Sequence, residues 1–116
     1  MIIRISRGRV RPGTEGDVFS RLRSATESRG RPEGMEAVYI GRHLTADGLD
    51  LVAITVWNDI EALISVMGEG WESAKWLPNI EELVTHSTVE HWETAVEDFA
   101  RFGVEGSGLA SQGGIG

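Results

Sequence analysis

The segment Leu49–Trp57 is apolar along almost its whole length, with Asp50 as its single charged residue. Its β-branched residues fit a pleated sheet better than a helix. A run of this kind is typical of a strand that is buried on both faces. Asp47 and Gly48 precede it, and this dipeptide is common in hairpin turns because it tolerates positive φ. The chain is therefore expected to pack around a central strand that is entered from a β-hairpin.

The segments around this strand follow the periods of strands and helices. Alternation of apolar and polar residues predicts strands over residues 1–10, 36–44 and 83–93. Helical spacing of apolar residues predicts helices over residues 15–28 and from Asn58 onward. The resulting order is β-α-β-β-α-β. It predicts an α+β protein with a ferredoxin-like fold, in which both helices cover one face of an antiparallel sheet.

Local signals predict where the helices begin and end. Thr14 and Asn58 each have an acidic residue three positions later, which is the spacing of an N-terminal capping box. The spacing of Trp71, Ala74, Lys75 and Leu77 predicts a further helical piece over residues 71–77. This piece is expected to end before Pro78, because the residue before a proline disfavours helix.

Residues 1–102 are expected to form a single domain with one hydrophobic core, and a short last helix is expected over residues 95–102. From residue 103 onward, six of 14 residues are glycine. We expect residues 103–116 to form a flexible tail, or to lie on a neighbouring chain.

The helices can cover only one face of the sheet, yet Leu49–Trp57 directs large apolar residues toward both faces. An uncovered apolar face requires a partner. A homodimer in which two sheets face each other is therefore predicted, with a barrel-like interior. A charged residue introduced at Leu51 is expected to break this dimer.

Composition and charge exclude several classes of function. The absence of cysteine excludes disulfides, thiolate metal sites and a cysteine nucleophile. The net charge of −7 argues against a nucleic-acid partner. Eight of the 11 basic residues lie in residues 1–31, where they are expected to be solvated or to face acidic groups of a second subunit or a ligand. The chain has neither a membrane-spanning apolar run nor a signal-peptide pattern at its start, so a cytoplasmic protein without a membrane partner is expected.

Residues 51–57 and the start of the following helix, residues 59–63, resemble those of the antibiotic biosynthesis monooxygenase-like domains of the dimeric α+β barrel group. Residues 88–93 are similar to the closing strand of that family, and the resemblance covers residues 1–95 through order and spacing. It implies a homodimer with a small-molecule pocket between sheet and helices in each subunit. Characterised members of the family include cofactor-free oxygenases of polyphenolic substrates and haem-degrading enzymes.

The residues that the resemblance would assign to these reactions are mostly replaced. In the cofactor-free oxygenases, an asparagine precedes the strand-end tryptophan by four residues and a tyrosine follows it by about six; this chain has Ala53 and Leu63 there and keeps Trp57. The haem-degrading branch has a histidine about 19 residues after the tryptophan, where this chain has Trp76. Its first-strand asparagine falls near Arg7. Neither mechanism carries over intact.

Five residues are candidates for a substrate site. Trp57 is expected either to stack on an aromatic ligand or to anchor the following helix. His91 is the best candidate for a catalytic acid or base, because histidine titrates near neutral pH; the alternative is a hydrogen-bonded structural histidine. Tyr39 could orient a phenolic substrate, Arg7 could hold an anionic group or form an intersubunit ion pair, and Trp71 could form a pocket wall.

No metal or other cofactor is expected. His86 and His91 fall on opposite faces of their strand and cannot share a metal ion, and His43 has no partner at helical spacing. The predicted function is that of a cofactor-independent monooxygenase-like enzyme acting on small aromatic metabolites. The alternative is a non-enzymatic small-molecule-binding or interaction module on the same fold, which the missing asparagine and tyrosine favour. Haem binding is disfavoured because no histidine occupies the expected position.

Overall fold

The computed structural model describes residues 1–95. The strands are β1 (Ile2–Val10), β2 (Met35–Thr45), β3 (Gly48–Trp57) and β4 (Val84–Glu93). The helices are α1 (Glu15–Arg29), α2 (Ile60–Met67) and the short α3 (Pro78–Glu81). Apart from Ala95, the helix predicted over residues 95–102 and the tail predicted over residues 103–116 lie outside the described residues.

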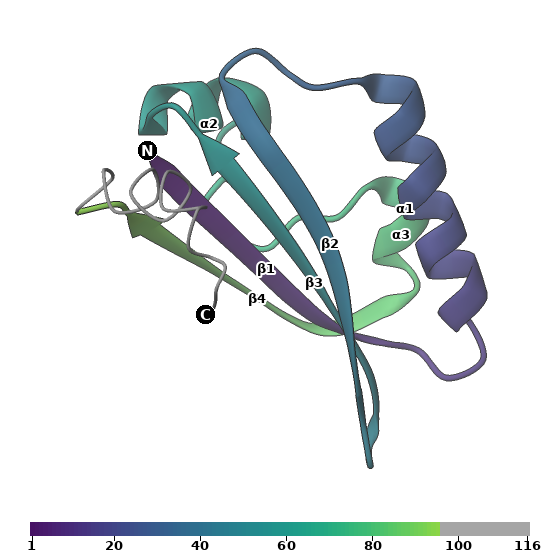
Figure 1. The fold of residues 1–116 in the computed structure, drawn as a ribbon. Helices are drawn as coiled ribbons and strands as arrows, with labels where there is room; N and C mark the ends of the chain where they lie inside the picture. Colours follow the sequence, from purple (N-terminus) through teal and green to yellow (C-terminus); the bar gives the residue numbers. More distant parts are fainter. Residues whose placement is uncertain (96–116) are drawn as a thin grey trace, which may run out of the picture.

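The four strands form one antiparallel sheet in the order β2-β3-β1-β4 (Figure 1). β1 lies in the middle, between β3 and β4, and β2 forms the edge beside β3. The predicted hairpin joins β2 to β3, with Ala46 and Asp47 between the strands and a positive φ of 145° at Gly48. This topology confirms the α+β, ferredoxin-like fold that the order of elements predicted.

The strand register divides the residues of the sheet between two faces. Directly paired residues on neighbouring antiparallel strands point to the same face. The face that the helices cover carries, from β1 and β3, Ile2, Arg4, Ser6, Gly8, Val10, Leu49, Leu51, Ala53, Thr55 and Trp57. The opposite face, called the open face below, carries from the same strands Ile3, Ile5, Arg7, Arg9, Asp50, Val52, Ile54 and Val56.

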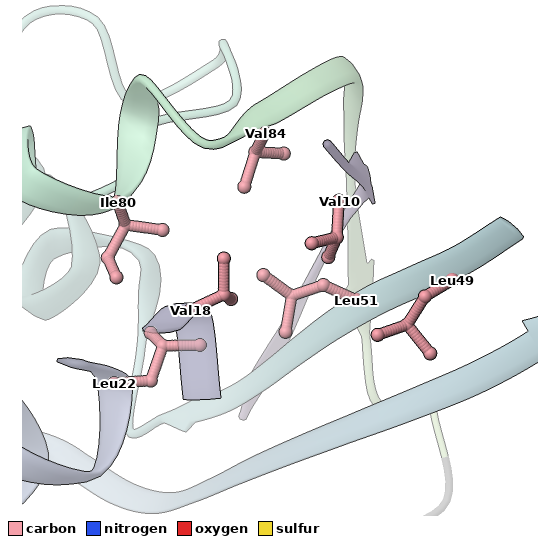
Figure 2. Packing of buried hydrophobic residues seen from close by; sticks show 7 residues of the cluster. All are labelled: Val10, Val18, Leu22, Leu49, Leu51, Ile80 and Val84. Carbon is pink, nitrogen blue, oxygen red and sulfur yellow. The ribbon is translucent and has the colours of Figure 1, made fainter. Parts of the chain in front are cut away.

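Two apolar clusters hold the helices on the sheet. The larger cluster, drawn in Figure 2, contains Val10, Val18, Leu22, Leu49, Leu51, Ile80 and Val84, and it joins α1 and α3 to three strands. The smaller cluster joins Leu63 of α2 to Ile2 and Trp57 at the other end of the sheet. Because burial of a large apolar side chain stabilises by roughly 1.5–3 kcal/mol, these clusters fix where the helices lie.

The N-terminal caps of the helices differ from the capping boxes that the sequence predicted. Thr14 is the N-cap residue of α1 as predicted, but its hydroxyl donates to the carbonyl of Arg11 at 2.7 Å and makes no capping hydrogen bond. The cap of α2 is Asp59, whose Oδ1 accepts from the backbone N–H of Ala62 at 2.8 Å. Asn58 is not the cap because its own backbone N–H is still bonded to the loop that precedes β2.

The helical piece predicted over residues 71–77 is wrong, because this segment has no regular secondary structure. The sequence predicted a helix that ends before Pro78, whereas the short helix α3 begins at Pro78. Proline suits the first turn of a helix because its φ is already fixed and its missing N–H is not needed there. None of the helices within residues 1–95 combines the length and the apolar character needed to cross a bilayer.

Candidate functional site

A cavity of about 370 Å³, called the sheet–helix cavity below, lies between the sheet and the helices. Its floor includes Arg4, Ser6, Ala53 and Thr55, which occupy the central covered-face positions of β1 and β3. The ends of the same strands carry the large apolar residues of the two clusters, whereas these four side chains are small or polar. The clusters therefore do not meet over the middle of the sheet, and a space remains there.

The walls of the cavity are largely apolar and come from several elements. Leu22 and Ala25 of α1, Met67 of α2, and Met35 and Trp57 of the sheet all contribute to the lining. A mostly apolar concavity with a few polar groups is the usual form of a small-molecule site. The size and lining of this cavity suit a small aromatic molecule.

Arg4 is the charged residue on the cavity floor, and only 3% of it is exposed. Its Nη1 donates to the carbonyl of Trp71 at 2.6 Å and to Nε2 of His91 at 2.9 Å, and its Nη2 donates to the carbonyl of Ser73 at 3.1 Å. These bonds tie the irregular segment before α3 to the sheet. Among residues 1–95, no carboxylate pairs with this guanidinium. Burial lowers the pKa of Arg4 from its usual value, but an arginine keeps its charge in proteins.

His91 lies beside Arg4 on the covered face, because the register pairs the two residues across β1 and β4. A guanidinium can only donate, so Nε2 of His91 accepts and the ring is neutral, with its proton on Nδ1. Burial lowers the pKa of His91 below its usual 6.5, the charge of Arg4 lowers it further, and Glu72 acts in the opposite direction. The ring of Trp71 packs edge-on against His91, with centroids 5.1 Å apart. Neither His91 nor Trp71 lines the cavity.

Trp57 is the predicted site residue that lines the sheet–helix cavity. It is 1% exposed, and its indole Nε1 donates to Oγ1 of Thr55 at 2.8 Å. It also packs with Leu63 of α2 in the smaller cluster. Trp57 thus anchors the following helix, as one alternative predicted, and also lines the cavity; stacking on an aromatic ligand stays a prediction.

Tyr39 and Arg7 lie on the open face, away from the sheet–helix cavity. The register pairs Tyr39 with Ile54, and 62% of Tyr39 is exposed. Arg7 forms an ion pair with Glu90 at 3.7 Å, in which both side chains are partly exposed. Such a pair contributes little to stability.

A second depression, of about 630 Å³, lies on the open face near the hairpin end of the sheet. It is lined by Arg7, Arg9, His43, Asp50 and His86, among others. Arg9 Nε donates to Asp50 Oδ1 at 2.6 Å, and this hydrogen bond lowers the pKa of Asp50. The pairing of β1 with β4 is irregular at this level, and His86 has a positive φ of 53°, which is typical of a β-bulge.

The donor set of the described residues does not suit a metal ion or a haem iron. No group of three or more histidine, cysteine, aspartate and glutamate side chains within residues 1–95 could hold a metal. The chain has three histidines, and none of them lines the sheet–helix cavity. His43 and His86 are on the open face, and Nε2 of His91 is already bonded to Arg4. The described residues around the cavity thus offer no histidine as an axial ligand to a haem iron.

Comparisons with known proteins support the fold. No protein-family model matches the sequence, and no curated protein matches it. Solved structures do match over 82–84% of this chain. They include the heme-degrader MhuD from Mycobacterium tuberculosis (13% identity, 98% of that chain, TM-score 0.62). They also include an antibiotic biosynthesis monooxygenase (19%, 100%, 0.61) and a mutant of SnoaB, a cofactor-independent oxygenase from Streptomyces nogalater (22%, 93%, 0.57).

The chain therefore has the ferredoxin-like fold of the antibiotic biosynthesis monooxygenase-like proteins, and the resemblance seen in the sequence is confirmed at the level of fold. At identities of 13–22%, these structures carry no assignment of activity or of site residues.

The floor residues Arg4 and Thr55 were not among the candidate site residues identified from the sequence. Alternation in β1 already placed Arg4 on the same side as Ile2 and opposite Ile3 and Ile5. The signal that could have identified Arg4 is an arginine on the face of β1 that has fewer other polar residues. The sequence could not tell which face the helices cover, so it could not place this arginine in a cavity.

Proposed function

We propose that the protein binds a small aromatic metabolite in the sheet–helix cavity and oxygenates it as a cofactor-independent monooxygenase-like enzyme. The observation that carries the proposal is the cavity itself, which has an aromatic wall at Trp57 and a buried guanidinium on its floor at Arg4. The shared fold with a protein described as a cofactor-independent oxygenase supports the choice of reaction.

In this proposal the substrate itself reduces dioxygen: at a ring CH2 carbon of an anthrone-type substrate, two C–H bonds are exchanged for a C=O bond, and the second oxygen atom leaves as water with the two hydrogen atoms. The protein supplies position and charge. A phenolic ring becomes electron-rich when it loses a proton, and a nearby cation stabilises the resulting anion. Arg4 is the cation on the cavity floor. His91 is neutral and could take up a proton only if Nε2 left Arg4 and gained access to the cavity. Its catalytic role stays a prediction, as do the ligand contacts of Trp71, Tyr39 and Arg7.

The test uses a panel of anthrones and hydroquinones with the full chain in aerated buffer. We expect a binding member of the panel to raise the free energy of unfolding by roughly 2.7 kcal/mol at 100 times its Kd, and to consume dioxygen above the background rate. The variant Ala53→Phe fills the cavity floor and should abolish both effects. Ala46→Phe adds the same ring to the exposed hairpin turn and should leave both unchanged. No stabilisation by any compound would contradict the proposal.

A non-enzymatic ligand-binding module is the second candidate. It is favoured because no histidine, aspartate or glutamate of residues 1–95 lines the cavity, so none of these bases faces a bound substrate. This alternative predicts stabilisation that Ala53→Phe abolishes, with dioxygen consumption equal to the background rate for every compound that binds.

We also propose that the protein is a homodimer through the open face. The centre of that face carries half-buried aliphatic residues of β1 and β3, and Trp92 beside them is 58% exposed. Contact with a second sheet would remove this surface from water. Cytoplasmic location and the absence of a nucleic-acid partner stay predictions.

The substitution that tests the dimer must lie on the open face. Leu51, where the sequence predicted that a charge would break the dimer, is 0% exposed and belongs to the larger cluster under the helices, so a charge there would unfold the subunit. Ile54 is at the centre of the open face. We expect Ile54→Asp to convert a dimer into a folded monomer in sedimentation velocity. A wild-type protein that sediments as a monomer at micromolar concentration would contradict the proposal.

A further inference from the structure

We infer that the sheet–helix cavity selects an aromatic acid, and that the ionised oxygen atoms of this ligand pair with Arg4. The inference rests on the proposed function, because it names the chemical class of the molecule that the same cavity binds. It makes Arg4 the residue that decides between an anionic ligand and a neutral ligand of the same shape.

The buried charge of Arg4 lacks a counter-charge among residues 1–95. A buried ion is costly unless it is paired, and Arg4 is only 3% exposed. Its partners are two backbone carbonyls and a neutral imidazole, none of which carries a negative charge. Glu72 acts on the titration of the neighbouring His91, but no carboxylate of residues 1–95 forms an ion pair with Arg4.

Arg4 also has hydrogen-bond donors that the described residues do not use. A guanidinium has five N–H groups in a planar fork. Three of them are used, two on Nη1 and one on Nη2. The Nε–H and the second N–H of Nη2 have no acceptor among the described residues. In a guanidinium, the Nε–H and the N–H of Nη2 that is syn to it form one edge, and such an edge matches the two oxygen atoms of a carboxylate.

The charges around the cavity have one sign. The protein as a whole carries a net charge of −7, yet the described side chains that line the cavity include Arg4, Arg29 and Lys75 and no aspartate or glutamate. Arg29 and Lys75 are exposed, and neither forms an ion pair within residues 1–95. Walls that carry one sign of charge raise the local concentration of ligands of the opposite sign.

The alternative is a purely structural role, in which Arg4 only ties the segment before α3 to the sheet. A structural arginine would affect stability without distinguishing an acid from its neutral analogue. The comparison of two isosteric ligands therefore separates the two roles.

The experiment measures the affinities of the full chain for 2-naphthoate and for 2-naphthamide by isothermal titration calorimetry near pH 7.5. We expect the acid to bind at least about ten-fold more tightly, which is the lower end of the effect of a hydrogen bond to a charged group. Arg4→Met should remove this preference, and Arg4→Lys should keep part of it because the charge remains. Arg23→Gln should leave the ratio unchanged, since it removes one charge from an exposed position on α1 outside the cavity.

The outcomes separate this inference from the proposed function. Equal affinity of the acid and the amide for the wild-type protein would overturn the selection of acids and leave the ligand cavity standing. No binding of either compound, together with no binding in the anthrone and hydroquinone panel, would overturn both. If Arg4→Met does not fold, as judged by circular dichroism, the wild-type pair of affinities and the folded Arg4→Lys variant still decide the question.

Discussion

Leu51 belongs to the larger apolar cluster and is fully buried, at 0% exposure (Figure 2). Leu51→Ala removes the equivalent of three methylene groups, which amounts to about 2.4 kcal/mol at about 0.8 kcal/mol each. The space that remains costs about 24 cal/mol per Å³, or about 1 kcal/mol for a residual cavity of about 40 Å³. We therefore expect the free energy of unfolding to fall by about 3 kcal/mol.

The assay is urea unfolding followed by far-ultraviolet circular dichroism at a fixed protein concentration. Leu44→Ala is the matched control, because it makes the same chemical change on the neighbouring strand at a side chain that is 79% exposed. Its effect should stay within about 0.5 kcal/mol, as for surface substitutions generally. A fall below about 1 kcal/mol for Leu51→Ala, or equal effects of the two variants, would refute the assignment of Leu51 to the core beneath α1.

Three further changes test other parts of the structure. Gly8→Ala should lower the free energy of unfolding by about 1–3 kcal/mol in urea melts, because the added methyl group would overlap Val84, whereas Gly16→Ala meets no neighbour and should not destabilise. Burial lowers the pKa of His91 below 6.5, so the folded state resists protonation of this ring. The free energy of unfolding should therefore fall as the pH drops below 6.5 toward the lowered pKa. His91→Gln should reduce this dependence of stability on pH. Asp50→Asn should weaken the acid-induced loss of stability below pH 3.8, because Arg9 lowers the pKa of Asp50 in the folded state. Acid titration followed by circular dichroism measures this loss.

The sequence was sufficient for the fold because the periods of its segments are regular. A sheet with one covered face produces the alternation in residues 1–10. A central strand produces the apolar run of Leu49–Trp57. The helix boundaries were harder to predict, because caps depend on the path of the neighbouring loop. Asn58 and Asp59 are both good capping residues, and the hydrogen bond of Asn58 to the loop before β2 decides between them.

The candidate site could be predicted only in part, because parity assigns residues to two faces without saying which face the helices cover. Trp57 was predicted correctly as a residue at the end of a buried strand, and it lines the cavity. The role of Arg4 depends on which groups surround its guanidinium. Its hydrogen-bond partners are 67 to 87 positions away in the sequence. Contacts of this separation leave no local pattern that can be read from the chain.

The central claim is that a small aromatic acid occupies the space between Trp57 and Arg4. A crystal structure of the full chain grown with 2-naphthoate tests it most directly. We expect the rings to lie in the sheet–helix cavity in contact with Trp57, with the carboxylate within hydrogen-bond distance of Arg4 and the Nε–H of Arg4 engaged. A ligand that binds only in the open-face depression beside Arg7 and Arg9, or a cavity that stays without ligand at saturating 2-naphthoate, would contradict the claim.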